Sequence, residues 1–298
     1  MKVGIPISKN AYTPESYAYK EYFESLGYDI ELDYKLDPNN DINLIFMGVK
    51  PFWKKTKGRA KEIHEYQSLS TYPFPKFKNL TKRFINEKPE GRIFLNSVVK
   101  EEFNFRDSRP YIFRDMGVDK SLFQKPDENP CYDIIYCGSI SSRNGLIEVL
   151  LNLAKCYKIV VIGKTSELEK KKLNVKNITL LGTLLRADLP DIYRNARYGL
   201  NYTPNIYPYN IQTSTKTLEY LASGLHVISN RYPWAEKFFN RIDYQPVWLD
   251  DNAKNQNIIL NDISVPNIPL IENYSWDKIL INSKVDRFLR ELLENEAI

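Results

Sequence analysis

Lys216 and Glu219 stand three residues apart in the segment QTSTKTLEYLASG, and their periodicity predicts a helix over 214–223. The free amides and positive dipole end of a helix N-terminus favour a phosphate. Lys216, in the first turn, is placed unfavourably there unless an anion lies between it and the helix. A carboxylate beside such a site is suited to accept hydrogen bonds from a ribose diol. The segment therefore predicts a phosphate site beside a ribose site; the alternative is a surface ion pair worth about 0.2–0.5 kcal/mol.

The two ends of this helix carry ordinary boundary signals. Thr213, Ser214 or Thr215 can cap its start with a side-chain oxygen. Gly224 fits the position after the last turn, where a positive φ is needed. We expect the polar residues, including Tyr220 and Ser223, to face solvent or a cleft, and the apolar ones to pack on a sheet.

The C-terminal half must position this helix, and it reads as alternating strands and helices. Such alternation predicts βαβ units and a parallel sheet. The expected strands are 132–140, 158–163, 177–184, 198–204 and 225–230, with helices at 144–156, 166–174, 187–196 and 214–223 between them.

The N-terminal half begins in the same manner. Its expected elements are strands at 2–7, 29–34, 42–49, 91–96 and 109–113 and a helix at 14–27. The polar, proline-bearing stretch QKPDENP at 124–130 reads as an interdomain linker. We therefore expect an α/β fold of two Rossmann-like domains, 1–125 and 126–275, facing across a cleft, and a closing C-terminal helix in 276–298 that packs back toward the first domain.

Composition restricts the class of protein. The chain has 298 residues and a formal net charge of +5, and its apolar runs are far shorter than the roughly 20 residues of a membrane helix. The three cysteines lack paired spacing, which argues against a disulfide framework and a structural zinc site. We expect a cytoplasmic protein with inert thiols and without a secretion signal.

Residues 50–92 hold the charge excess, with 12 basic residues against 4 acidic ones. The stretch 50–61, KPFWKKTKGRAK, also contains Phe52 and Trp53. Such a segment could sit on anionic lipid at the inner face of a membrane, or hold a phosphate-bearing partner. A solvated lysine-rich loop is the alternative. We expect no nucleic-acid partner.

The motifs of the C-terminal half match a known family. In the order YCGSISSRNG, VVIGK, ITLLGTL, DLPDIYRNARYGLNYTP and TSTKTLEYLASGLHVISN, residues 130–235 resemble the donor domain of GT-B glycosyltransferases, particularly the family-four (glycosyltransferase group 1) enzymes. The similarity extends weakly to NYSWDKIL at 273–280. It implies a two-domain GT-B fold and a nucleotide-sugar donor, most simply a UDP sugar.

The resemblance assigns roles to individual residues. Glu219 would contact the ribose and Lys216 the diphosphate, while Arg143 would neutralise the leaving group. The remaining donor-binding residues that it implies are Gly138, Ser139, Gly163, Lys164, Gly182, Thr183, Ser214 and Thr215. We take Lys216 and Arg143 as catalytic groups as well.

One position departs from the family pattern. Many retaining members have a glutamate eight residues before the ribose-binding one, but Ile211 stands there, flanked by Tyr209, Asn210 and Gln212. A hexosyl transfer with retention is the expectation, and the departure leaves the stereochemical outcome open.

On the acceptor side, His64 in KEIHEYQS is suited to acid–base work near neutrality and is expected to face the cleft, although a lone histidine is often structural. His226, inside LHVISN, is expected in the core. No D-x-D metal motif occurs in the sequence, which favours a metal-independent site without a cofactor.

The resemblance implies transfer to a glycan or lipid-linked acceptor in bacterial envelope polysaccharide or lipopolysaccharide synthesis. Two alternatives stay open at this point. One is a nucleotide-sugar epimerase of the same fold. The other is a non-catalytic subunit that binds a nucleotide sugar or glycan.

Overall fold

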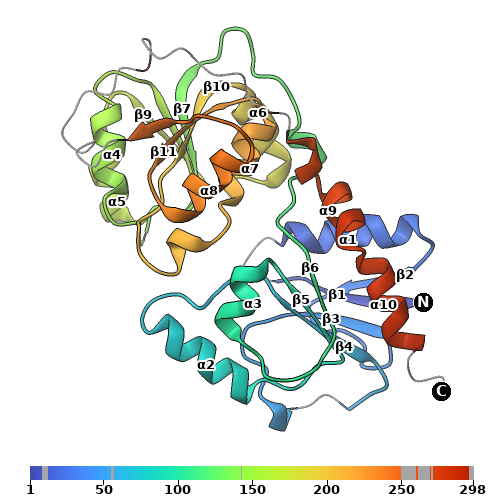
Figure 1. Cartoon of the computed structure of the whole chain (residues 1–298). Helices are drawn as coiled ribbons and strands as arrows, with labels where there is room; N and C mark the ends of the chain where they lie inside the picture. Colours follow the sequence, from blue (N-terminus) through green and yellow to red (C-terminus); the bar gives the residue numbers. More distant parts are fainter. Residues whose placement is uncertain are drawn as a thin grey trace. The chain divides into compact units, whose positions relative to one another are not determined.

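The computed structural model describes residues 1–8, 13–54, 57–141, 143–249, 260, 269 and 271–294. The chain divides into two compact units, Met1–Gly117 with Asn273–Ile298, and Val118–Glu272 (Figure 1). Residues 118–125, expected in the first domain, thus belong to the second unit. Their attachment is specific, since the Ser223 hydroxyl donates a hydrogen bond to the Leu122 carbonyl at 3.0 Å.

Unit 1 contains a parallel sheet with the strand order β2-β1-β3-β4-β5-β6. The direction of strand progression reverses between β1 and β3, as in doubly wound α/β folds. The described elements of this unit are β1 (Lys2–Pro6), α1 (Pro14–Ser25), β2 (Asp29–Asp33), β3 (Ile42–Phe46), η1 (Phe52–Lys54), β4 (Lys61–Tyr66), α2 (Pro75–Ile85), β5 (Gly91–Phe94), α3 (Ser97–Phe103), β6 (Tyr111–Phe113), α9 (Trp276–Ser283) and α10 (Val285–Glu294).

The core of unit 1 joins both ends of the chain. Tyr19 and Phe23 of α1 pack with Leu280 of α9 and with Phe288 of α10 against the apolar strands. The C-terminal helices therefore cover the same face of this sheet as α1. The weak similarity at 273–280 falls at the start of this helical region.

Unit 2 contains a second parallel sheet, ordered β12-β11-β10-β7-β8-β9, with a reversal between β7 and β10. Its described elements are η2 (Lys120–Leu122), β7 (Tyr132–Cys137), α4 (Leu146–Leu153), β8 (Ile159–Ile162), α5 (Glu167–Leu173), β9 (Ile178–Gly182), η3 (Arg186–Asp188), α6 (Leu189–Arg194), β10 (Ala196–Asn201), η4 (Tyr209–Ile211), α7 (Thr215–Ala222), β11 (His226–Asn230), α8 (Pro233–Arg241) and β12 (Val247–Leu249). The 3-10 turn η5 (Glu272–Tyr274) lies at the division between the units.

The expected fold class is confirmed: both units are parallel α/β sheets covered by helices (Figure 1). The elements β4, α2, α3, α8 and β12 were not expected from the sequence patterns. No described helix has the length and apolar character needed to cross a bilayer.

Candidate functional site

The site lies at the carboxyl ends of the central strands of unit 2. Gly138 follows β7 and Gly163 follows β8, with φ values of +145° and +141°. A Cβ on Gly163 would lie 2.2 Å from the carbonyl oxygen of Gly138, so the two strand ends approach too closely for a side chain there. Gly163 in turn donates its amide to the Gly182 carbonyl at 2.8 Å. The three glycine-ended strands thus form one continuous edge.

A cavity of about 230 Å³ opens at the reversal between β7 and β10, the usual ligand position in such a sheet. It is lined by Cys137 at the end of β7, by Gly138 directly after it, by Thr203 after β10 and by the start of α7. Its lining residues are Cys137, Gly138, Arg143, Thr203, Tyr209, Gln212, Thr213, Ser214, Thr215 and Lys216.

Two positively charged side chains, Arg143 and Lys216, line the cavity, and no carboxylate is among its lining residues. Lys216 Nζ donates to the Tyr202 carbonyl at 3.3 Å and lies 5.2 Å from the centre of the Tyr136 ring. Arg143 lies 5.2 Å from the centre of the Tyr209 ring. Burial lowers the pKa of Lys216 to about 7, and the nearby charge of Arg143 adds to this effect. In the described part of the chain, neither cation pairs with a carboxylate.

The N-terminus of α7 is open toward this cavity because its cap residue is engaged elsewhere. Ser214 occupies the N-cap position, but its side chain makes no capping hydrogen bond. Its hydroxyl donates instead to Asn201 Oδ1 at 3.0 Å and accepts from the Thr217 hydroxyl at 3.0 Å. The expected side-chain cap is therefore wrong. The Thr217 amide donates to the Ser214 carbonyl at 3.1 Å, and the Thr215 and Lys216 amides keep their capacity to donate to a ligand. Gly224 has the expected positive φ, +69°.

The expectation that Tyr220 and Ser223 face solvent or a cleft is also wrong. Tyr220 and Ser223 are fully buried. The Tyr220 hydroxyl accepts the Cys137 amide at 2.9 Å, and its ring packs on Gly199, where a Cβ would lie 2.2 Å from the ring. These partners lie far away in sequence, so helical periodicity could not identify them.

Glu219 is held by two neighbours behind the cavity. Arg186 donates to Oε1 at 2.9 Å, and the Tyr193 hydroxyl donates to Oε2 at 3.0 Å. Only 8% of the Glu219 side chain is exposed. The alternative of a surface pair between Lys216 and Glu219 is thereby excluded, because the carboxylate is committed to Arg186.

Of the donor-site residues expected from the sequence, Gly138, Arg143, Ser214, Thr215 and Lys216 line the cavity. The others, which do not line it, are Ser139, Gly163, Lys164, Gly182, Thr183 and Glu219. Ser139, Lys164 and Thr183 are exposed in the loops after β7, β8 and β9.

Several residues of the site were not assigned a role from the sequence. Arg186 and Tyr193 hold Glu219, and Cys137, Tyr136 and Thr203 surround Lys216 or line the cavity. Arg186 had a usable signal, because it is a basic residue just after a predicted strand, as Arg143 is. Tyr209 and Gln212 do line the cavity beside Ile211, which does not.

His64 requires a correction. It lies within β4 and is fully buried, rather than following a strand and facing a cleft. Burial lowers its pKa, although Glu62, whose carboxylate lies 3.7 Å from Nε2, opposes that shift. A buried ring of this kind cannot offer a proton to an acceptor at the surface. His226 is only partly buried, at the start of β11.

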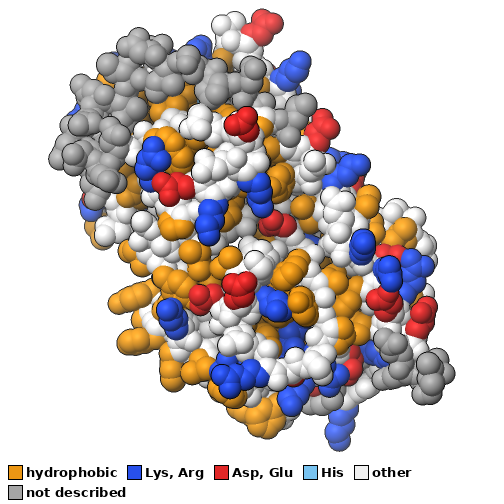
Figure 2. Space-filling model, in the orientation of Figure 1, with side chains coloured by type: hydrophobic (Ala, Val, Ile, Leu, Met, Phe, Trp, Pro, Cys, Tyr) orange, Lys and Arg blue, Asp and Glu red, His pale blue; other side chains and the backbone are white. Residues whose placement is uncertain are grey.

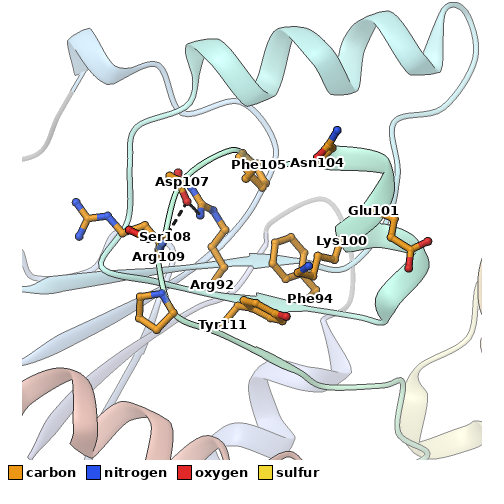
Figure 3. A pocket seen from close by; sticks show the side chains of 11 residues that line it. Arg92, Phe94, Lys100, Glu101, Asn104, Phe105, Asp107, Ser108, Arg109 and Tyr111 are labelled. Carbon is orange, nitrogen blue, oxygen red and sulfur yellow. Dashed lines mark hydrogen bonds and ion pairs between the residues drawn. The ribbon is translucent and has the colours of Figure 1, made fainter.

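Unit 1 contains a second, larger cavity of about 690 Å³ (Figure 3). Arg92 is bound there by Asp107 at 2.6 and 2.7 Å and stacks on Phe105, and Lys100 lies over the Tyr111 ring. The positive charge in this cavity is therefore partly balanced by Asp107, whereas no carboxylate lines the cavity in unit 2. Among the described residues, no group of three or more His, Cys, Asp or Glu is placed to hold a metal ion.

A family model matches the part of the chain that carries α7. Residues 143–252, which include Arg143, α7 and Glu219, match the family model described as glycosyl transferase-like. No curated protein sequence matches the chain.

Solved structures match over nearly the full length. AviGT4, a glycosyltransferase involved in avilamycin A biosynthesis, is 12% identical with a TM-score of 0.62, covering 99% of this chain and 98% of its own. A Rickettsia africae glycosyltransferase is 14% identical with a TM-score of 0.62, covering 99% and 98%. Anabaena HepE, solved with UDP-glucose, is 12% identical with a TM-score of 0.59, covering 98% and 100%.

The chain has the GT-B glycosyltransferase fold. At such low identity the GT-B matches establish this architecture, and the family model independently covers the segment around α7.

Proposed function

We propose that this chain is a glycosyltransferase that moves a hexosyl group from a UDP sugar to a hydroxyl of a glycan or lipid-linked acceptor. The observation that carries the proposal is the cavity shared by Lys216, Arg143 and the uncapped start of α7. Two cations and free amides without a balancing carboxylate suit a diphosphate.

The same groups support the chemistry of transfer. Cleavage of the bond between the sugar and the diphosphate leaves negative charge on the departing oxygen. Lys216, Arg143 and the amides of Thr215 and Lys216 would stabilise that charge as it develops. Because burial keeps the pKa of Lys216 near 7, the ligand's own charge would complete the protonation of this lysine.

Glu219 is proposed to accept hydrogen bonds from the ribose. Each carboxylate oxygen already receives one hydrogen bond, from Arg186 or Tyr193, and each can accept another. The two donors would fix the orientation of the carboxylate before the nucleotide arrives. This assigns Arg186 and Tyr193 as positioning residues.

Four further features of the function are part of the proposal: the base of the donor, the stereochemical outcome, metal independence and the pathway. The choice of uridine follows from the fold shared with HepE, which was solved with UDP-glucose. Retention of configuration and a place in bacterial surface polysaccharide synthesis are proposed from the resemblance of the C-terminal half to family-four enzymes. Metal independence is proposed from the absence of a D-x-D motif in the sequence. Proton NMR of the product's anomeric signal would decide retention, and activity after treatment with EDTA would decide metal independence.

The protein is also proposed to lie at an anionic membrane surface, as expected for residues 50–61. Phe52 and Trp53 of this segment are exposed, and residues 55–56 lie outside the described part of the chain. A peripheral position would bring the enzyme to a lipid-linked acceptor.

The test is incubation of the purified protein with a panel of UDP, GDP and TDP sugars, followed by chromatography of nucleotides and sugars. Slow release of UDP from one donor supports a transferase. Interconversion of sugars without release of nucleotide would support an epimerase, and binding without any turnover would support a non-catalytic subunit. Lys216→Ala serves as the site control, because it should abolish release.

A further inference from the structure

Helix α2 turns its apolar face toward solvent. Phe77, Leu80 and Phe84 follow each other at spacings of three and four residues, and their exposed fractions are 68%, 43% and 68%. Tyr72 and Phe74, just before the helix, are 76% and 75% exposed. Figure 2 shows hydrophobic side chains protruding from the surface over α2. A contiguous exposed row of large apolar side chains marks an interaction surface.

The orientation of α2 is fixed by polar contacts on its inner side. Asn79, opposite the apolar row, is buried and accepts the Ser70 amide at 3.0 Å. At the other end, the Asn86 side chain accepts the Lys50 amide at 3.0 Å, and Pro51 pairs with Asn86 as an isolated bridge. These contacts prevent the helix from turning its aromatic residues inward.

The bridge also extends the surface. It places the start of η1 next to the C-terminus of α2, and η1 carries Phe52 and Trp53, both of which are about 60% exposed. We call the residues Tyr72, Phe74, Phe77, Leu80, Phe84, Phe52 and Trp53 the α2 surface.

Basic residues lie on both sides of the apolar row. At 100° per residue, Lys76 and Arg83 fall on one side of Phe77 and Phe84, and Lys78 and Lys82 fall on the other. The sequence from 67 to 86 contains no acidic residue. Burial and the neighbouring charge of Lys78 lower the pKa of Lys82.

We propose that the α2 surface docks on an anionic lipid bilayer, with its aromatic side chains in the interface and the flanking basic residues on the lipid headgroups. Helices that lie in a membrane surface typically combine one strongly apolar face with a basic border and a polar opposite side. Pairing of two copies through this face would bring equal rows of lysine and arginine together, which disfavours a self-association interface. The proposal rests on the membrane position proposed above and not on the transfer reaction, and it adds α2 and the aromatic residues before it to the contact proposed for residues 50–61.

The test is co-sedimentation of the full-length protein with vesicles of phosphatidylcholine alone or with about one quarter phosphatidylglycerol. The wild type should bind the anionic vesicles, more weakly at high salt because the headgroup contacts are screened. The double variant Phe77→Ser with Phe84→Ser should lose about tenfold or more in vesicle partitioning. Lys76→Gln with Lys78→Gln should weaken binding to anionic vesicles by a similar factor.

Helix α5 of unit 2 offers matched controls. Leu168→Ser removes an apolar side chain that is 72% exposed, and Lys171→Gln with Lys172→Gln removes the same charge from exposed positions. Both controls should bind vesicles as the wild type does. A melting curve for each variant checks that it is folded, and UDP affinity, measured separately, reports on the donor site alone.

Three results would overturn the proposal. One is absence of wild-type binding to anionic vesicles, and another is equal loss of binding in the α5 controls. The third is a wild-type oligomer in analytical ultracentrifugation that Phe77→Ser with Phe84→Ser dissociates, since this would make the surface a contact between copies.

Discussion

Arg186 donates a hydrogen bond of 2.9 Å to Glu219, and this contact separates the two charged residues of α7 into different roles. The Glu219 carboxylate is paired with Arg186 and does not line the cavity, so Lys216 has no carboxylate partner there. A buried lysine without a carboxylate partner destabilises the fold, and a bound anion would offset this cost.

If Arg186 orients Glu219 for the ribose, Arg186→Gln should weaken UDP binding by less than Glu219→Ala does. The two changes should also be non-additive, with a coupling of about 0.5–3 kcal/mol in a double-mutant cycle measured by calorimetry. Arg194→Gln is the control, because Arg194 pairs with Asp127 at 3.0 Å on the surface of the same unit. Additive effects of Arg186→Gln and Glu219→Ala would show that the arginine does not act through Glu219.

The affinity for UDP should fall as pH rises above 7. In the free protein the pKa of Lys216 is about 7, and a bound diphosphate should raise it, so binding at higher pH must take up a proton. The expected loss approaches tenfold per pH unit, measured by calorimetry between about pH 7 and 9, where the phosphates are already ionised.

Lys216→Arg provides the control for this pH dependence, since a guanidinium stays charged throughout that range. Its affinity should be nearly flat with pH, whatever its value at pH 7. An equal slope in wild type and Lys216→Arg would assign the titration to another group.

The glycine-ended strands should differ in their tolerance of alanine. Gly163→Ala places a Cβ 2.2 Å from the Gly138 carbonyl oxygen at a φ of +141°, and it should destabilise unit 2 by about 3 kcal/mol or more. Gly182→Ala meets nothing within 4 Å at a φ of +69° and should cost only about 1 kcal/mol. Denaturant unfolding would measure both, and equal losses would contradict the close approach of β7 and β8.

Unit 2 was largely predictable because its local patterns agree with its tertiary structure. Its strands β7 and β8 are apolar runs that end at glycine, and α7 carries its own end signal in Gly224. The cations Arg143 and Lys216 could be placed at one edge because parallel strands end on the same side. The burial of α7 could not be predicted, since Tyr220 and Ser223 are buried by partners from β7 and η2.

Unit 1 was less predictable because polar residues occupy its core. The strand β4 reads KEIHEY, yet Glu65 is buried, where it accepts from Tyr19 at 3.0 Å and pairs with Arg114. These partners come from α1 and from the end of β6, so no local pattern identifies the strand. Helix α2 also departs from the usual pattern, in which the apolar face of a helix packs on the core, because its large apolar residues face solvent.

The most direct test of the donor-site assignment is calorimetric titration of UDP into the wild type and Lys216→Ala, with thermal melting as the check on folding. We predict that the wild type binds and that Lys216→Ala loses tenfold or more in affinity, about 1.4 kcal/mol, while its melting temperature does not fall. Equal affinity in the two folded proteins would contradict the assignment of this cavity to the donor diphosphate.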